Sequence, residues 1–571
     1  MSSNASVDIY SKVNELYIKN LVTQKLKNET ENPIELKIYV DKIENTIFSS
    51  FSAKIGDSIE VKSKVIKKSK AEEKYTDSIS SGNAAIFVSK DRFNSRIIIN
   101  MGNIPPKQEV IFKTEFIQFV EYSNSYEFEL FRNLPIFIEK NSVFQNSEIK
   151  GTIEINTKNK IYKIDKKKLS EQLNIVEEKY LNENKCEYLV KYEYKNLTTL
   201  SLYNFYSYIQ SSKICFEIEK DEPILFCQKS PKENEINYII QYRFNKKELN
   251  KENNNVLNPS LFIFLVDQSG SMNGHPMEVA SKAIILFLQS LPAGSYYQII
   301  GFGSYYEIYD ETPKEYTQKN IKESIKFLET LGANKGGTNI YSPLKYIYNS
   351  KEEYNKIKLP KNIFLLTDGA IDNNKKTLNM IEENSNEFSV YSIGIGNDFD
   401  KDLIKNAGIV GKGNYDFCYD IKDLKRIIVK EIKNCSIPFI HDFEFNCSLN
   451  EKNLYQLNNK IFLLKGNQII NLKYIIKNEN ELNNKIKLNI KYNIYSSKKK
   501  KDVEINENFE IESKEIQTGE ELFKLIINEY LLNNDNLNEE EKTKLALKYQ
   551  ILTDYTSLFA EIELSEEIKK K

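Results

Sequence analysis

The stretch LFIFLVDQSGS, residues 261–271, decides the fold that the sequence predicts. Its first six residues, Leu261–Val266, are an unbroken apolar run, which is typical of a strand buried on both faces of a parallel sheet. Asp267, Ser269 and Ser271 then follow at alternate positions. Doubly wound sheets bind ligands outside the carboxyl ends of their strands. We therefore expect these three polar side chains to lie at a ligand-binding edge.

Segments with the spacing of strands and helices alternate from this strand to about residue 435. A second inner strand is expected at Lys361–Thr367, which contains the apolar run Ile363–Leu366. The alternation predicts a doubly wound, Rossmann-like α/β sheet. Further strands are expected at Tyr297–Phe302, Phe388–Ile395 and Asn414–Tyr419, and helices at about 280–291, 320–331, 341–349, 400–407 and 421–433.

Two other loops are expected to meet Asp267–Ser271 at the same edge. One is Asp368-Gly369, which ends the second inner strand, and the other is Gly336-Gly337-Thr338-Asn339. Carboxylate and hydroxyl oxygens are hard donors that suit Mg²⁺, Ca²⁺ or Mn²⁺. Five such donors would leave one coordination position open. The predicted metal ligands are Asp267, Ser269, Ser271, Thr338 and Asp368, and no role is assigned to Gln268. The alternative is a fold that keeps these residues but binds no ion.

The flanking regions indicate β-rich domains. Strands are expected at Glu35–Val40, Ala84–Val88, Arg96–Asn100 and Glu109–Phe119, with a helix at Lys67–Ser80, and helices return at Glu520–Asn533 and Glu539–Gln550. A polar stretch, Asn245–Asn258, indicates a linker. The predicted organisation is an N-terminal tail (1–20), a β domain (21–140), a β-rich extension with its linker (141–255), the α/β domain (256–435) and a C-terminal β region with terminal helices (436–571).

Composition narrows the class of protein. Among 571 residues, 80 basic and 81 acidic side chains nearly cancel, so neither nucleic acid nor an anionic membrane is an expected partner. The six cysteines form no CxxC pair, which gives no zinc or redox signal. The first residues lack the basic and apolar regions of a signal peptide, and no apolar run is long enough to span a bilayer. We therefore expect a cytoplasmic protein.

The combination of Asp267-x-Ser269-x-Ser271, Thr338 and Asp368-Gly369 resembles the metal-ion-dependent adhesion site of von Willebrand factor A domains. The resemblance implies that Ser269, Ser271 and usually Thr338 touch the metal. It also implies that Asp267 and Asp368 act largely through water, and that a carboxylate of a partner protein takes the open position.

The flanks resemble a VIT domain followed by the tail of intracellular VIT–VWA proteins, which are relatives of inter-alpha-trypsin inhibitor heavy chains. The residues that carry this resemblance are Ala71, Tyr75, Ser81–Ala85, Phe93 and Gly102–Pro106, together with residues 546–557. The secreted heavy chains have a signal peptide and an Asp-Pro-His attachment motif. This sequence has neither, since its two histidines are His275 and His441.

The function we expect is non-catalytic capture of an acidic residue of a partner protein through bound Mg²⁺. Two alternatives remain open. One is a hydrolase that uses the same metal to activate water, with His275 as the candidate base, although His275-Pro276 also suits the start of a helix. The other is a structural subunit of an intracellular particle.

Overall fold

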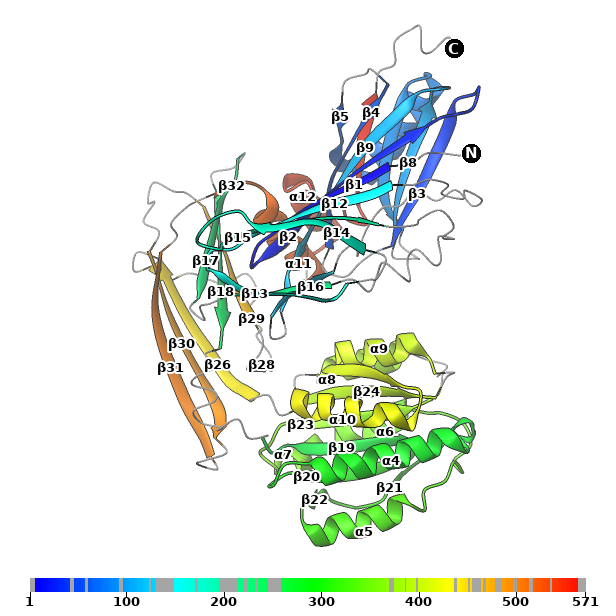
Figure 1. Ribbon diagram of the computed structural model, residues 1–571, viewed down its shortest axis with the longest axis vertical. Coiled ribbons are helices and arrows are strands. Elements are labelled where there is room, and N and C mark those ends of the chain that lie inside the picture. Colours follow the sequence, from blue (N-terminus) through cyan, green and yellow to red (C-terminus); the bar gives the residue numbers. More distant parts are fainter. Residues whose placement is uncertain are drawn as a thin grey trace.

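The computed structural model shows a β-rich body and, apart from it, an α/β domain (Figure 1). The α/β domain comprises the described residues among 258–435, and residues of the body both precede and follow it in the sequence. The structure describes residues 6–41, 46–56, 60–91, 96–122, 125–129, 148–169, 173–194, 213–218, 223–231, 235–244, 258–368, 374–385, 387–396, 399–435, 439–449, 452–453, 464–465, 469–477, 485–496, 499, 501–512, 517–534 and 537–562. The predicted linker therefore lies almost entirely outside the described residues.

Two sheets that share one hydrophobic core form the N-terminal part of the body. Phe112 of β9 and Ile99 of β8 are examples of the residues that each sheet buries there. The larger sheet has the order β14-β15-β12-β1-β2-β9-β4-β5 and the smaller β3-β8-β7-β33-β6. Their bounds are β1 Ser6–Val13, β2 Tyr17–Lys27, β3 Ile34–Asp41, β4 Thr46–Ile55, β5 Val61–Lys62, β6 Lys64–Lys67, β7 Ala84–Asp91, β8 Arg96–Ile104, β9 Glu109–Phe119, β12 Glu148–Asn156, β14 Leu173–Tyr180, β15 Glu187–Tyr194 and β33 Thr556–Ile562.

Strand β1 corrects the N-terminal tail that we predicted over residues 1–20. Val7, Ile9 and Val13 of this strand are buried and alternate with exposed residues, which is the pattern of a strand with one face on a core. The strand pairs antiparallel with β2 and parallel with β12. The N-terminal β domain therefore begins within the segment that we assigned to the tail.

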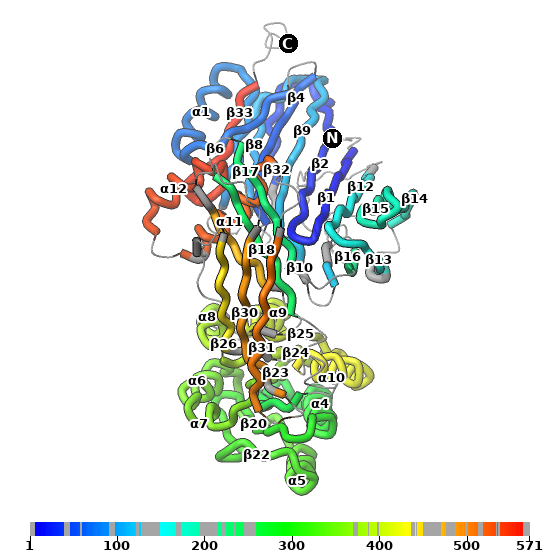
Figure 2. Tube along the Cα trace, turned by 90° about the vertical axis from the view of Figure 1, so that its left-hand side faces the viewer, coloured from blue at the N-terminus to red at the C-terminus, as the bar shows by residue number. Residues whose placement is uncertain are grey.

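The predicted elements of this domain are otherwise confirmed. Helix α1 spans Lys68–Ser80, and β3, β7, β8 and β9 contain the four predicted strands. Strand β33 was not predicted. It lies between β7 and β6 and pairs with both, antiparallel. Figure 2 shows the red strand β33 beside α1, among the blue strands of the N-terminal part, so residues near 560 complete a sheet built from residues before 105.

The predicted extension (141–255) and C-terminal region (436–571) are interleaved and do not form two separate domains. Strand β18 pairs with β17 on one side and with β29 on the other, and its Tyr238 and Tyr242 share a core with Leu488 and Tyr492 of β30. The bounds are β10 Glu121–Tyr122, β11 Tyr126–Glu129, β13 Ile161–Lys168, β16 Lys213–Ile218, β17 Ile224–Lys229, β18 Glu235–Arg243, β26 Phe439–Leu449, β27 Lys452–Asn453, β28 Leu464–Lys465, β29 Ile469–Lys477, β30 Lys485–Ser496, β31 Lys501–Glu512, β32 Gln517–Thr518, α11 Glu521–Asn533 and α12 Glu539–Lys548.

The α/β domain has the doubly wound architecture that the sequence predicts. Its sheet has the order β21-β20-β19-β23-β24-β25, and β19 is parallel to both β20 and β23. Every residue of β19 is buried, because helices cover both faces of the sheet. The strand bounds are β19 Leu261–Asp267, β20 Tyr296–Phe302, β21 Tyr306–Ile308, β22 Lys314–Glu315, β23 Lys361–Thr367, β24 Phe388–Ile395 and β25 Lys412–Cys418.

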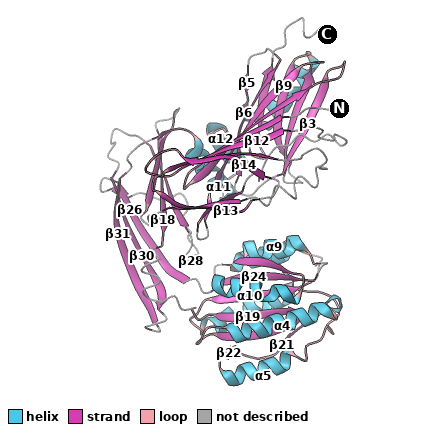
Figure 3. Ribbon diagram, in the orientation of Figure 1, coloured by secondary structure: helices cyan, strands magenta, loops and turns pink. Residues whose placement is uncertain are grey.

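The helices divide between the two faces of this sheet, which Figure 3 shows as strands sandwiched by helices. Phe264 and its neighbours pack against α4, α5 and α10 on one face, and Ile263 and Leu265 pack against α6, α7, α8 and α9 on the other. Helices α7 and α8 were not predicted. The helix bounds are α4 His275–Ser290, α5 Gln318–Leu328, α6 Tyr341–Asn349, α7 Lys351–Asn355, α8 Asn374–Asn384, α9 Lys401–Val410 and α10 Ile421–Cys435.

Candidate metal-binding site

The loop after β19 turns sharply and places its polar side chains against the end of β23. The Ser269 backbone N–H donates to Asp267 Oδ1 at 2.8 Å, and residues Gly270–Met272 form one 3₁₀ turn. Across the sheet, the Thr367 hydroxyl donates to Asp267 Oδ2. Asp267 is thus held from its own loop and from the neighbouring strand.

A continuous chain of hydrogen bonds joins four of the five predicted ligands. The Ser269 and Ser271 hydroxyl oxygens lie 3.0 Å apart, and the Ser271 hydroxyl donates to Asp368 Oδ1 at 2.9 Å. Asp267 joins this series of hydrogen bonds by accepting from the Ser269 backbone N–H. The expected meeting of the loops after β19 and β23 is therefore confirmed as geometry, whereas the role of these residues as metal ligands stays a prediction.

The loop that carries Thr338 is tied to the same edge through its backbone. The Gly270 N–H donates to the Gly336 carbonyl at 2.7 Å, and the Lys335 N–H donates to the Gln268 carbonyl at 2.9 Å. Gly336 has φ +75°, a left-handed conformation that glycine adopts without strain. Thr338 is half-buried and lies two residues after Gly336.

The electrostatics of the site favour a cation. Asp267 is fully buried. Burial raises the pKa of its carboxyl, and hydrogen bonds from Ser269 and Thr367 oppose that rise. Within the described residues, Asp267 forms no ion pair with a Lys, Arg or His side chain. A buried carboxylate without a counter-charge is costly. The donors present, two carboxylates and three hydroxyls, fit a hard divalent ion.

Two residues outside the predicted set also build this edge. The buried Gln268 side chain donates from Nε2 to the Gly332 carbonyl at 2.9 Å and accepts from the Tyr309 hydroxyl. The Ser304 hydroxyl accepts from the Gly337 N–H at 2.8 Å. We assigned no role to Gln268, so the structure corrects that expectation. Spacing alone gave no signal for Ser304, because it lies on a loop that follows a different strand.

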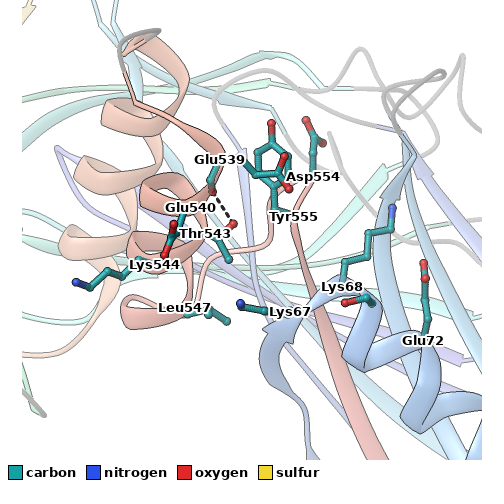
Figure 4. A pocket seen from close by; sticks show the side chains of 11 residues that line it. Lys67, Lys68, Glu72, Glu539, Glu540, Thr543, Lys544, Leu547, Asp554 and Tyr555 are labelled. Atoms are coloured by element: carbon teal, nitrogen blue, oxygen red, sulfur yellow. Dashed lines mark hydrogen bonds between the residues drawn. The ribbon is translucent and has the colours of Figure 1, made fainter.

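A groove of about 900 Å³ lies far from this edge, between the start of α1 and α12 in the β-rich body (Figure 4). Its side chains carry both signs of charge, and the Thr543 hydroxyl that lines it donates to the Glu539 carbonyl at 2.7 Å. This mixture singles out no class of ligand. The lining residues are Lys67, Lys68, Ser69, Glu72, Glu539, Glu540, Thr543, Lys544, Leu547, Asp554 and Tyr555.

Comparison with known proteins identifies both domains. The sequence profile of the von Willebrand factor type A domain matches residues 261–417, and that of the vault protein inter-alpha-trypsin (VIT) domain matches residues 4–116. The chain therefore carries a von Willebrand factor A (VWA) domain. More particularly, a VIT domain precedes this VWA domain in the chain, as the resemblance implied.

Relatives of the same kind occur in an amoeba and in mammals. A von Willebrand factor A domain-containing protein of Dictyostelium discoideum is 26% identical over 444 residues, covering 76% of this chain and 44% of that protein. The von Willebrand factor A domain-containing protein 5A of Rattus norvegicus is 25% identical over 446 residues, covering 72% of this chain and 52% of that protein. The chain thus spans about half the length of these relatives.

Solved structures of VWA proteins resemble the chain more distantly. A von Willebrand factor type A protein from Catenulispora acidiphila is 12% identical with a TM-score of 0.36, covering 52% of this chain and 73% of that one. The proximal thread matrix protein 1 of the mussel byssus, with a zinc-occupied MIDAS motif, is 15% identical with a TM-score of 0.27, covering 34% of this chain and 50% of that one.

Proposed function

We propose that the VWA domain holds a divalent cation, Mg²⁺ in the first place, and through it binds an acidic residue of a partner protein. Ser269, Ser271 and Thr338 would hold the ion directly, and Asp267 and Asp368 through water. The observation that carries the proposal is the buried Asp267 carboxylate, which forms no ion pair within the described part of the chain and is linked to Asp368 through Ser269 and Ser271.

The proposed coordination leaves room for an anionic partner group. The three hydroxyls that would touch the ion are neutral, and both carboxylates would act through water, so no negatively charged group of this chain would touch the ion directly. Mg²⁺ prefers six oxygen ligands, and five protein side chains leave one position to fill. A carboxylate at that position would be a hard oxygen donor of the kind already present.

We propose a binding role and not an enzymatic one. His275, the candidate base, lies in the first turn of α4 with a 53% exposed side chain, and its Nδ1 is 3.8 Å from the Glu278 carboxylate. The carboxylate that His275 faces therefore belongs to its own helix α4 and not to the candidate metal site. The alternatives remain a metal-dependent hydrolase, tested by turnover of phosphoesters and peptides, and a structural subunit of an intracellular particle, which would bind its partners equally well in EDTA.

We propose a cytoplasmic location and a protein partner, with no nucleic acid or membrane partner. None of the helices in the described part of the chain has the length and apolar character needed to cross a bilayer. The nearly equal numbers of basic and acidic residues support the absence of a nucleic-acid partner.

The test is calorimetric titration of the chain with Mg²⁺, Ca²⁺ and Mn²⁺, with Asp267→Asn as the variant and the exposed Glu311→Gln as the charge-matched control. We expect Asp267→Asn to weaken Mg²⁺ binding by about 10- to 100-fold, as for residues that hold a ligand in place. At 100 times its Kd, Mg²⁺ should stabilise the wild type by about 2.7 kcal/mol.

Thermal melting in EDTA separates the metal from the fold. Asp267→Asn should melt no lower than wild type in EDTA, because it removes a buried charge, but lower in Mg²⁺. Wild-type protein that binds none of the three ions would overturn the proposal. Affinity capture in Mg²⁺ and in EDTA then tests the partner, which should be released by EDTA.

A further inference from the structure

Four tyrosines lie beside the candidate metal loops and take no part in the ligand set. Tyr305 and Tyr306 follow β20, and Tyr341 and Tyr346 belong to α6, which begins three residues after Thr338. Tyr305 is 58% exposed and Tyr306 is 37% exposed. We call Tyr305, Tyr306, Tyr341 and Tyr346 the tyrosine rim.

The rim is fixed to the loops of the candidate site by backbone hydrogen bonds. Ser304, directly before Tyr305, donates its N–H to the Lys335 carbonyl at 2.7 Å, and its hydroxyl accepts from the Gly337 N–H at 2.8 Å. The Asn339 N–H donates to the Gly303 carbonyl at 2.9 Å. Tyr305 and Thr338 therefore lie on two loops that are held together on both sides of the glycine pair.

Side-chain contacts hold the exposed rings in place. The Lys335 ammonium lies 4.9 Å from the centre of the Tyr305 ring and forms an ion pair with Glu307 at 2.6 Å. The Tyr306 and Tyr346 rings lie 5.6 Å apart, and the Lys376 ammonium lies 4.4 Å from the Tyr341 ring. Such rings present a large contact area at a small cost in side-chain entropy, which is why tyrosine is enriched in the energetically important part of interfaces.

The charges of the rim indicate the chemistry of its ligand. The negative charge of Glu307 is already engaged by Lys335, and the Lys376 ammonium lies over the Tyr341 ring. A surface with aromatic rings and a lysine, adjoining a cation that binds a carboxylate, complements an acidic segment with an apolar neighbour.

We propose that the tyrosine rim selects the residues next to the partner's metal-binding acid, and that the partner is an acidic peptide segment with an aromatic or long aliphatic side chain beside that acid. This inference rests on the proposed function of the metal site. The apolar side chain would pack on Tyr305 and Tyr306, while the acid binds at the ion.

The test uses the full chain and a library of short peptides with a fixed central Asp, in which each flanking position is varied in turn. Binding is measured in Mg²⁺ and in EDTA. The wild type should prefer aromatic or long aliphatic residues beside the Asp by about tenfold over Gly or Ser, in Mg²⁺ only. The double variant Tyr305→Ser/Tyr306→Ser should lose this preference but keep its affinity for Mg²⁺ and its requirement for Asp.

The control is Leu286→Ser, at an exposed apolar residue in the C-terminal half of α4, which should leave both properties unchanged. Melting temperature and Mg²⁺ affinity check that each variant is folded. A wild type that needs Mg²⁺ and Asp but shows no flanking preference would overturn the rim while leaving the metal site in place. If the double variant Tyr305→Ser/Tyr306→Ser kept the preference for aromatic or long aliphatic residues beside the Asp, the rim proposal would likewise be overturned and the metal site would stand. If the wild type binds no peptide in Mg²⁺, both proposals are overturned.

Discussion

Gln268 donates a hydrogen bond to the carbonyl of Gly332 across 2.9 Å, and this contact joins the loop after β19 to the segment that leads into Gly336-Gly337-Thr338. The Gln268 backbone does the same, because its carbonyl accepts from the Lys335 N–H at 2.9 Å. Gln268, which lies between the candidate ligands Asp267 and Ser269, thus positions the loop that carries the candidate ligand Thr338.

Replacing this residue, as Gln268→Ala, should destabilise the VWA domain and weaken Mg²⁺ binding. The substitution removes the donor to the Gly332 carbonyl and the acceptor of the Tyr309 hydroxyl, and the loss of such hydrogen bonds costs about 1 kcal/mol each. Denaturant unfolding and calorimetry measure the two effects. Asn273→Ala, at an exposed position two residues after Ser271, is the control and should change neither. Equal stability of Gln268→Ala and wild type would show that the contact does not support the loop.

Gly336→Ala tests the conformation of the same loop. A methyl group at Gly336 would lie 2.9 Å from the Ser304 hydroxyl oxygen at a residue with φ +75°. We expect a cost of about 1–3 kcal/mol for a non-glycine residue held in this region, together with weaker Mg²⁺ binding. Gly332→Ala is a matched control, because nothing lies within 4 Å of its added carbon. A similar loss of Mg²⁺ affinity in both variants would argue against a specific role for Gly336.

The pH dependence of stability should change in Glu15→Gln. Glu15 is buried, its Oε2 has no hydrogen-bond partner among the residues that the structure describes, and burial raises its pKa from the ordinary 4.5. The folded chain therefore binds more protons than the unfolded chain as the pH rises past 4.5, so the free energy of unfolding falls over that interval. Glu15→Gln should remove this fall and be more stable than wild type at pH 7.

Urea unfolding at several pH values between 4 and 8 measures this difference, which should shrink toward zero at the acid end. The variant Glu183→Gln, at an exposed position, serves as the control. Its free energy of unfolding should depend on pH as that of the wild type does. A Glu15→Gln profile parallel to that of the wild type would mean that Glu15 titrates alike in both states.

Leu558→Ala should loosen the smaller sheet of the VIT domain. Leu558 of β33 is buried and pairs with Val88 of β7 and Val65 of β6, so truncating it removes core contacts at a cost of about 2–5 kcal/mol. Hydrogen exchange should show faster exchange in β6 and β7, and unchanged exchange in β19 and β23. The exposed Glu561→Gln should not alter the exchange of β6 or β7. Protection of β7 that is independent of β33 would contradict the assignment.

The elements that the sequence predicts well are those whose pattern is strong within a few residues. Strands β19, β23 and β24 are apolar runs buried on both faces, and their bounds lie within one residue of the prediction. The helix α8, NKKTLNMIEEN, buries few apolar side chains and offers little periodicity. Strand β1 does alternate, with Val7 and Ile9 inward, but polar outer residues obscured the pattern.

The residues of the candidate site also differ in how far a local sequence pattern predicts them. Asp267, Ser269 and Ser271 follow one strand, and Asp368 follows a parallel neighbour, so the topology alone brings them together. The contacts of Gln268, Ser304 and Tyr305 depend on how loops from different strands settle against each other, which no local pattern in the sequence encodes. The boundaries predicted for the β regions that flank the α/β domain were wrong for a related reason. Strand β18 pairs with β29, and nothing in either strand specifies so distant a partner.

The place of β33 within the smaller sheet has a consequence for biosynthesis. Leu558 pairs with Val88, 470 positions earlier in the chain. At ribosomal rates of about 5–20 residues per second, the nascent chain waits for tens of seconds between the emergence of β7 and that of β33. Throughout that time β7 has an unpaired edge, and such edges invite pairing with other chains. Completion of the VIT domain is thus a late event in translation, and a chaperone that shields this edge would act on the ribosome-bound chain well before the VWA domain is finished.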